Sequence, residues 1–543
     1  MGRLEGSLAF LVNPAPPCVL FEDDDLLVVN KPAGINTHSP APHAGDGLYD
    51  WLRHREPRWA SLALIHRLDK ETSGVMVFAK TSRAKQSLTR QFAGHSIQKT
   101  YLLLTDRPPH AAERRLRTAL VRSGDRYHAR PPHAGADIAE TVFRPSQSHA
   151  GPNCIEAEPL TGKTHQIRVH AAKLGHPILG DTLYGGSTAA RVCLHSHRLV
   201  FRHPVTNESR TFECPAQFDL DPGFTLRTAL ISPSDTNAYR LVHGSADGSP
   251  GWYVDRFGVV LLSQSATPLT DARRAQLARL LALHSCRAAC HKALLRRPDA
   301  PTSSSPAATL VLGDIASPTL QILENGVRFQ LDLAAGYSVG LFLDQRENRR
   351  RLLVNHIAAH FPSRSPAHPQ PHVLNAFAYT GGFSVCAALS GASTTNIDLS
   401  SKYLDWAKTN FRLNNLNPDD HAFLTGDVFD WFRRLGRKQR CFDTILLDPP
   451  TFSRSKTHGV FRAEKDYARL VSAALPLLKD SGVLFASANT ARLPAETFLS
   501  DLSKSISAAG RRILRQHYSP QPFDFPITRS EPAHLKTVWF QIE

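Results

Sequence analysis

The 543-residue sequence contains no uninterrupted apolar run of the ~18 residues that a membrane-spanning helix needs. Its first residues also lack a basic stretch followed by a clear apolar run, which argues against a secretory signal peptide. Its eight cysteines are scattered and form no ladder of C-x-x-C pairs, a usage typical of reduced thiols. We therefore expect a soluble, cytoplasmic protein.

A metal site has little support either. Cys286 and Cys290 are flanked by His284 and His291, but this spacing is not that of a standard zinc ligand set. An ordinary helix with partly buried thiols is the simpler interpretation, and we expect no metal.

Acidic residues are outnumbered: 48 Asp and Glu against 64 Lys and Arg give a formal charge of +16 and a pI near 9.6. With 42% hydrophobic and 21% charged residues, the mix is that of a globular protein, not of a disordered or collagen-like chain. The positive excess favours an acidic partner, most simply a phosphate backbone, although a solvated basic surface would give the same composition.

The order of apolar segments predicts three domains. Residues 15–222 are richer in short strands than in helices, which indicates an α+β domain with a mixed or antiparallel sheet. Residues 223–345 predict a small α+β middle domain, with helical periodicity over 270–296 and a loose Pro/Ser-rich loop at 298–308. In residues 346–543, strands and helices alternate from Val373 onward, as in a doubly wound, Rossmann-like α/β domain.

The first chemical candidate is Asp69, which lies between Arg67 and Lys70 in the loop HRLDKETSG. Nearby positive charge favours an ionised carboxylate, and a positioned carboxylate can act as a nucleophile. Arg168, in the helix that follows residues 161–164, offers a further cation. For this loop on its own, a surface ion pair would be the simpler interpretation.

Four motifs in one order make the pattern specific: NKPAGI at 30–35, HRLDKETSG at 66–74, KTYLLLT at 99–105 and GKTHQIRVHAAKLGHPILGDTLYG at 162–185. Over roughly residues 15–220 the chain resembles the RluA-type family of pseudouridine synthases. The resemblance implies that Asp69 attacks or assists at the glycosidic bond of uridine, whose base detaches, turns and rejoins through C5 without a cofactor. Whether the aspartate adds to the sugar or a transient glycal forms stays open.

The same resemblance assigns roles to three neighbours of Asp69. Arg67 would fill the space of the extruded nucleotide, Tyr101 would stack on the uracil and assist proton transfer, and Arg168 would hold Asp69. Without the resemblance, Tyr101 would be a core tyrosine and Arg168 a phosphate contact on a helix surface. Lys163 replaces the arginine that is usual in the family. Lysine keeps the positive charge but lacks the planar guanidinium, so we expect the change to affect RNA binding more than catalysis.

A second candidate site begins with the strand, glycine turn and helix of VLNAFAYTGG at 373–382, which lacks the G-x-G-x-x-G of dinucleotide sites. Asp398 after the next strand could bind ribose hydroxyls, Asp427 an adenine amine, and Asp448 opens the motif DPPTF. Each alone could cap a helix. Together they favour one crevice for an adenosyl cofactor.

Over roughly residues 235–543 the chain resembles class I S-adenosylmethionine-dependent methyltransferases, more narrowly the RlmI- and RlmK-type rRNA enzymes. The motifs are RLVHGSADGSPGWYVDRFG at 240–258, SVGLFLDQRENR at 338–349, LNAFAYTGGFSV at 374–385 and DPPTFSRSK at 448–456. The cofactor and active-site residues that it implies are Asn375, Tyr379, Gly381, Asp398, Asp427 and Asp448. Asp344 and Arg346 would line the rim or form a structural ion pair, and Lys456 would touch phosphate or stay solvated.

The sequence departs from 5-methylcytosine enzymes, which need a cysteine nucleophile after the fourth or fifth strand. Neither place has one, and Cys386 and Cys441 are badly placed. Transfer to nitrogen therefore fits better, with N7 of guanine as the specific hypothesis. Asp448, Phe452 and Asn489 would line the base pocket with Phe452 stacking, unless Phe452 plugs local core.

The sequence thus predicts a bifunctional RNA-modifying enzyme that isomerises uridine and methylates a base of ribosomal RNA, most simply 23S rRNA, with S-adenosylmethionine. The alternatives are an enzyme with a single activity, whose other half only binds RNA, and a non-catalytic ribosome-assembly factor.

Overall fold

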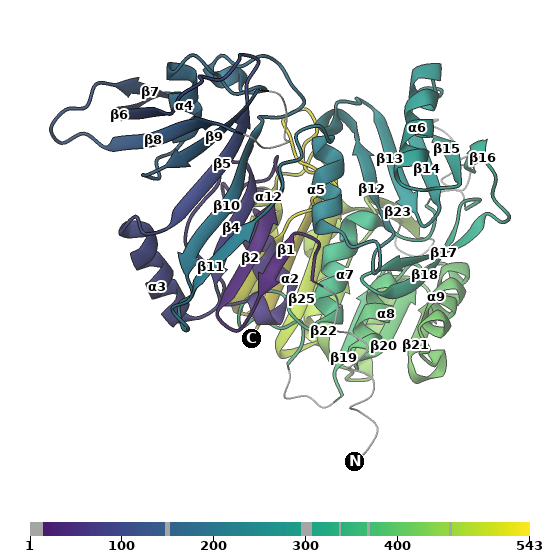
Figure 1. Cartoon of the computed structure of the whole chain (residues 1–543). Helices are drawn as coiled ribbons and strands as arrows, with labels where there is room; N and C mark the ends of the chain where they lie inside the picture. Colours follow the sequence, from purple (N-terminus) through teal and green to yellow (C-terminus); the bar gives the residue numbers. More distant parts are fainter. Residues whose placement is uncertain (1–14, 147–152, 295–306, 336–337, 366–369, 456–458) are drawn as a thin grey trace.

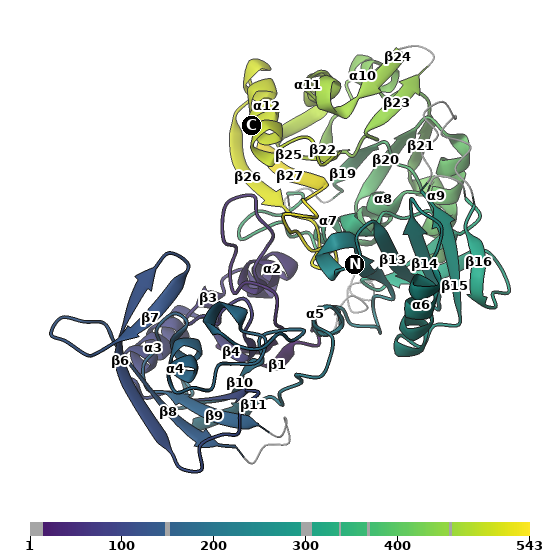
Figure 2. The same ribbon diagram turned by 90° about the horizontal axis from the view of Figure 1, so that it is seen from above.

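The computed structural model describes residues 15–146, 153–294, 307–335, 338–365, 370–455 and 459–543, with only the backbone of 453–455. Figures 1 and 2 show the N-terminal half, purple to blue, as one lobe and the C-terminal half, green to yellow, as another. In both views α2, α5 and α7 lie between the two lobes. No helix in the described ranges is long and apolar enough to cross a membrane.

The N-terminal lobe is built on a sheet in the order β1-β2-β4-β10-β5-β9-β8-β6-β7, with β3 beside β4 and β11 beside β10. Its strands are β1 (Val19–Glu22), β2 (Leu26–Lys31), β3 (Ala63–Leu64), β4 (Ser73–Ala79), β5 (Gln98–Leu104), β6 (Arg114–Ser123), β7 (Arg126–Arg130), β8 (Ile138–Pro145), β9 (Cys154–Pro159), β10 (Leu194–Arg202) and β11 (Ser209–Glu213). Its helices are α2 (Leu48–Arg55), α3 (Ser82–Ala93) and α4 (Gln166–Lys173). Because β4 and β10 run parallel within an otherwise antiparallel sheet, the expected mixed sheet is confirmed.

The middle region forms a sheet in the order β12-β13-β14-β15-β16 and a separate hairpin, β17-β18. Its strands are β12 (Ala238–His243), β13 (Trp252–Phe257), β14 (Val260–Ser265), β15 (Ala288–Ala293), β16 (Thr309–Gly313), β17 (Thr319–Glu324) and β18 (Val327–Asp332), and its helices are α5 (Pro222–Leu230) and α6 (Asp271–Leu283).

The helix expected over 270–296 is wrong in its second half. Helix α6 ends at Leu283, Ser285 takes a left-handed turn with φ 51°, and β15 follows, parallel to β14. Cys286 therefore lies in the turn and Cys290, 1% exposed, in the sheet, not in one helix. Burial of β15 between β14 and β16 overrides the local helical pattern.

The C-terminal lobe has the doubly wound sheet that the alternating pattern predicts, in the order β21-β20-β19-β22-β25-β27-β26. Its strands are β19 (His372–Ala376), β20 (Ser393–Asp398), β21 (Ala422–Thr425), β22 (Phe442–Leu447), β25 (Leu478–Asn489), β26 (Ile513–Ser519) and β27 (Leu535–Ile542), with a separate hairpin of β23 (Phe452–Ser455) and β24 (Gly459–Arg462). Its helices are α7 (Arg346–Leu353), α8 (Gly382–Leu389), α9 (Ser401–Leu413), α10 (Val428–Arg437), α11 (Ala463–Ala474) and α12 (Ala495–Ala508). The sequence did not predict β26, a mostly polar strand at the edge of the sheet. It also did not predict the short hairpin of β23 and β24, which lies outside the main sheet.

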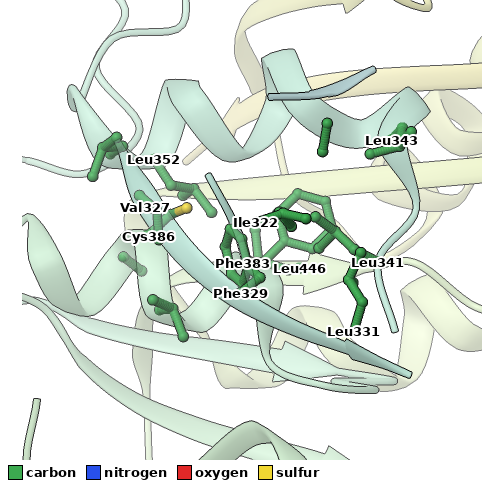
Figure 3. Close-up of a cluster of buried hydrophobic side chains, with 14 of the residues drawn as sticks. Ile322, Val327, Phe329, Leu331, Leu341, Leu343, Leu352, Phe383, Cys386 and Leu446 are labelled. Atoms are coloured by element: carbon green, nitrogen blue, oxygen red, sulfur yellow. The ribbon is translucent and has the colours of Figure 1, made fainter. Parts of the chain in front are cut away.

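The three predicted domains share hydrophobic cores. Figure 3 shows Phe329 of the β17-β18 hairpin beside Phe383 of α8, in a core that also contains Leu352 of α7, so the middle region packs on the C-terminal lobe. A second core joins Trp51 of α2 to Trp252 of β13. The domain bounds stay a prediction.

A buried polar seam joins α2 to α7. Arg350, 1% exposed, pairs with Glu56 and lies 3.4 Å from the carbonyl oxygen of Arg55. The Nε2 atom of His356 lies 2.9 Å from the carbonyl oxygen of Arg53. The seam links the two lobes through buried polar contacts.

Candidate functional sites

A cavity of about 1150 Å³ opens in the N-terminal lobe, and Asp69, Arg67, Tyr101 and Arg168 all line it. The loop that carries Asp69 connects β3 to β4. Thr37 anchors it, because its hydroxyl donates to the carbonyl oxygen of Leu68 at 2.7 Å and accepts from the amide of Leu68 at 3.1 Å. The sequence motifs thus meet in one place, although they lie a hundred residues apart.

Arg168 is fixed beside Asp69 by a carboxylate that the sequence analysis did not single out. Its Nε and Nη2 atoms each donate to Asp181 at 2.7 Å, while Nη1 lies 3.8 Å from Asp69 Oδ2. Arg168 is 6% exposed, so the alternative of a helix-surface contact is wrong. Asp181 lies within the quoted motif GHPILGD, but only the fold brings it back to α4.

Tyr101 presents a protonated hydroxyl to the same cavity. Burial, opposed by the nearby Ser196 side chain and reinforced by the charge of Asp69, raises the pKa of Tyr101 to about 12. Arg67 is exposed, as a side chain that replaces an extruded nucleotide would be. Lys163 pairs with Asp137.

Lys31 is a further residue that the sequence analysis missed, although it lies in the NKPAGI motif. Its ammonium group is fully buried and donates to the carbonyl oxygens of Pro32, Ile35 and Lys70 at 2.9, 2.8 and 3.2 Å. Burial lowers the pKa of Lys31 to about 7. Lys31 therefore ties the loop after β2 to the loop that carries Asp69.

In the C-terminal lobe, the strand register puts the candidate carboxylates at one edge. Ala376 of β19 pairs with Ile397 of β20 and with Leu447 of β22, so Asp398, the last residue of β20, and Asp448, directly after β22, lie at the same edge on either side of β19. Parallel strands present their carboxyl ends to a shared crevice.

The turn after β19 is shaped around Asp398. Asp398 accepts from the backbone amides of Tyr379 at 2.8 Å and Ser400 at 2.9 Å, and burial raises its pKa. Tyr379 and Gly381 have φ of 51° and 75°. A Cβ atom on Gly381 would lie 2.8 Å from that of Ala407, so the glycine lets the turn pack closely on α9.

Asn375 and Asp427 complete this crevice. Asn375 is 1% exposed and donates to Ser384 Oγ at 2.8 Å, while its Oδ1 has no hydrogen-bond partner within the described ranges. Asp427 caps α10 by accepting from the amide of Phe429 at 2.9 Å, and it also lines a small pocket with Asp398. An orphaned acceptor, a buried carboxylate and a close glycine turn fit an adenosyl cofactor.

Asp448, Phe452 and Asn489 lie where β22 and β25 end. Burial raises the pKa of Asp448 to about 6. Phe452 is 52% exposed, so the alternative of a core plug is wrong. The carbonyl oxygen of Asn489 accepts from Thr451 Oγ1 at 2.7 Å, which joins the ends of the two strands.

The rim candidates are structural. Arg346, 4% exposed, donates to both oxygens of Asp524 at 2.9 and 2.6 Å, and Asp344 lies 3.1 Å from His534 Nε2. Arg346 thus forms the structural ion pair that the sequence analysis offered as an alternative, while Asp344 contacts His534. Lys456 lies outside the described residues.

The two C-terminal cysteines lie away from the crevice. Cys386 belongs to the core seen in Figure 3, where burial raises its pKa far above the ordinary value for a thiol. Cys441 precedes β22, at the opposite end of the strand from Asp448. In the described part of the chain, no group of three or more His, Cys, Asp or Glu side chains could hold a metal ion.

Comparisons with known proteins find a different family in each half of the chain. The family model for RNA pseudouridylate synthase matches residues 25–173, and that for S-adenosylmethionine-dependent methyltransferase matches 256–540. A ribosomal RNA large subunit methyltransferase of Deinococcus radiodurans is 32% identical over 341 residues, which is 60% of this chain and 78% of that protein. Ribosomal RNA large subunit methyltransferase I of Escherichia coli is 31% identical over 319 residues, 57% of this chain and 75% of that protein.

Among solved structures, human RNA pseudouridylate synthase domain containing 4 is 25% identical, with a TM-score of 0.31, over 41% of this chain and 97% of that one. The chain belongs to the S-adenosylmethionine-dependent methyltransferase family and carries an RNA pseudouridylate synthase domain in its N-terminal half.

Proposed function

We propose that the chain modifies ribosomal RNA twice, by isomerising a uridine in the N-terminal cavity and by methylating a base in the C-terminal crevice. The observation that carries the first activity is Asp69 beside an arginine that Asp181 locks in place. The relatives' substrate and the net charge of +16 support RNA as the partner. The proposal places the enzyme in the cytoplasm, with its cysteines as free thiols.

In the N-terminal cavity, the ionised Asp69 acts at the glycosidic bond of an extruded uridine. Arg168 holds the carboxylate, Arg67 fills the vacated position in the RNA, and Tyr101 packs on the base with a hydroxyl that can donate or relay a proton at C5. In the isomerisation the N1–C1′ bond breaks and a C5–C1′ bond forms, C5 loses a proton and N1 gains one. Because no electrons are gained or lost, the proposal requires no cofactor in this half.

In the C-terminal crevice, S-adenosylmethionine supplies an electrophilic methyl group when bound. Asn375, the Tyr379–Gly381 turn and Asp398 would hold it, with Asp427 beside the adenine. Asp448, Phe452 and Asn489 would orient the target base, Phe452 by stacking. Because Cys386 and Cys441 lie away from this crevice, we propose transfer to a nitrogen, with N7 of guanine as the target.

Asp69→Asn tests the first activity. Unmodified bacterial rRNA is incubated with each variant and pseudouridine is mapped chemically. We expect the wild type and the exposed control Asp24→Asn to form pseudouridine and Asp69→Asn to form none, while all three retain methyl transfer. Pseudouridine formation by Asp69→Asn, or none by the wild type on any bacterial RNA, would contradict the proposal.

Calorimetric titration with S-adenosylhomocysteine tests the second. Asp398→Ala should weaken binding, and Asp405→Ala, at a 70% exposed side chain of α9, should not. The alternative of a single activity predicts no methyl transfer to any RNA despite intact pseudouridine formation. If both activities are absent in the wild type, the assembly-factor hypothesis takes their place.

A further inference from the structure

A buried glutamine contacts the carboxylate on which the proposed methyl transfer depends. Gln345, 3% exposed, lies directly before α7. Its Nε2 atom lies 3.2 Å from Asp448 Oδ1 and 2.9 Å from Ser487 Oγ. It reaches Asp448 from 103 residues away in the sequence, so spacing along the chain could not reveal the contact.

A chain of hydrogen bonds fixes which end of the Gln345 amide faces Asp448. The indole nitrogen of Trp539 can only donate, and it lies 3.1 Å from Asn348 Oδ1. The other end of the Asn348 amide is therefore a donor, and its Nδ2 lies 2.8 Å from Gln345 Oε1. Gln345 Oε1 is thus an acceptor, and Nε2 must point at Asp448.

Ser487 completes the arrangement at the end of β25. It is fully buried, and its hydroxyl accepts from Gln345 Nε2 at 2.9 Å, while its side chain lowers the pKa of Asp448. The Gln345 amide is a neutral donor that occupies one of the about four acceptor positions of the Asp448 carboxylate. The other acceptor positions of an ionised Asp448 carboxylate can bind only a group that donates a proton in a hydrogen bond.

We propose that Gln345 is a positioning residue for methyl transfer. It holds Asp448 as an ionised acceptor, so that the pocket selects a nucleobase that offers an N–H group. This inference rests on the methyl transfer proposed above and adds the residue that sets its pH range and its choice of base.

Two charged neighbours also act on Asp448, and a buried tyrosine lies close by. The carboxylate of Asp344 on the turn before α7 raises the pKa of Asp448, and the guanidinium of Arg349 on α7 lowers it. Tyr467 of α11 donates instead to the carbonyl oxygen of Leu447 at 2.9 Å. Since Gln345 lowers the pKa of Asp448, its removal raises that pKa while the other three groups stay in place.

Gln345→Met, which keeps the length of the side chain and removes the donor, tests this role. Methyl transfer to unmodified rRNA is measured from pH 5 to 9, with Gln516→Met on the exposed face of β26 as the control. We expect the acid limb of kcat to move up by about one pH unit in Gln345→Met. The KM for S-adenosylmethionine and pseudouridine formation should stay at wild-type values.

If the acid limb does not move in Gln345→Met, or if kcat falls by the same factor at every pH, the role of Gln345 is overturned. The proposed methyl transfer would still stand. Methyl transfer that is undetectable in the wild type would overturn both. Asn348→Leu, which frees the Gln345 amide to turn, gives a second reading if Gln345→Met does not fold. Asn348→Leu should also move the acid limb of the kcat–pH profile to higher pH. An acid limb at the wild-type pH would count against the proposal.

Discussion

At the scale of single residues, the key carboxylates of the two sites have different neighbours. The Asp69 side chain is 29% exposed and lies 3.8 Å from the guanidinium of Arg168. Asp448 has a neutral donor, Gln345, and a carboxylate neighbour, Asp344, and burial raises its pKa to about 6. The Asp448 carboxylate is therefore an anion at neutral pH at a cost in folding stability.

That cost should be visible in Asp448→Asn. The folded pKa lies above the usual 3.9 or so, so the native state binds more protons between about pH 4 and 6, and stability falls as the pH rises through that window. We expect Asp448→Asn to raise the Tm at pH 7.5, to lose the advantage below about pH 4, and to lose methyl transfer. Asp314→Asn, at an exposed carboxylate, should change neither. A lower Tm for Asp448→Asn at pH 7.5 would disprove this account.

Arg168→Lys should show that geometry matters at the first site as well as charge. Lysine keeps the positive charge but cannot donate to both oxygens of Asp181 while it faces Asp69. We expect pseudouridine formation to fall by at least about tenfold, the equivalent of roughly 1.4 kcal/mol, with methyl transfer unchanged. Single-turnover kinetics would measure it, and a wild-type rate would rule out the fixed geometry.

At the scale of elements, the turn between β19 and α8 depends on a glycine at a close approach. Gly381→Ala places an alanine in the left-handed region, which costs about 1–2 kcal/mol of folding stability. Its Cβ atom would also lie 2.8 Å from that of Ala407. Gly391→Ala, at φ 91° with open space around it, adds only the backbone cost. We expect Gly381→Ala to lower the Tm further than Gly391→Ala and alone to weaken S-adenosylhomocysteine binding. Equal effects would show that the contact with α9 is unimportant.

The α2–α7 seam is the other element whose role can be measured. Removing one partner leaves a buried charge unpaired, so Arg350→Met should cost about 3–5 kcal/mol in denaturant unfolding. Arg350→Met combined with Glu56→Leu should recover part of that loss, because neither charge is then left alone. A double variant less stable than the single one would mean that the pair does not act as a unit.

At the scale of the whole molecule, charge should govern RNA binding by both halves. With a net charge of +16, displacement of condensed counterions from RNA should make the affinity fall by at least about tenfold between 50 and 200 mM salt. Filter binding with an unmodified rRNA fragment measures this. A salt-independent affinity would point to recognition that does not rest on phosphate contacts.

Much of the architecture could be predicted from the sequence. The alternation after Val373 predicted the doubly wound sheet, and the helix expected after residues 161–164 is α4, Gln166–Lys173. The pattern failed at β15, where a run of alanines and a cysteine reads as helix but is buried between two strands. It also failed at β26, whose polar edge position leaves no alternating apolar signal.

What the sequence determined by itself is local: the aspartate loop at 69, the glycine turn at 381, the carboxylates after strand ends and the excess of positive charge. The tertiary structure decided the contacts that make these residues a site. Asp181 locks Arg168 from 13 residues away, Gln345 reaches Asp448 from 103 and Arg350 meets Glu56 from 294. Such pairings depend on which surfaces bury one another when the chain collapses, and no spacing along the sequence encodes that.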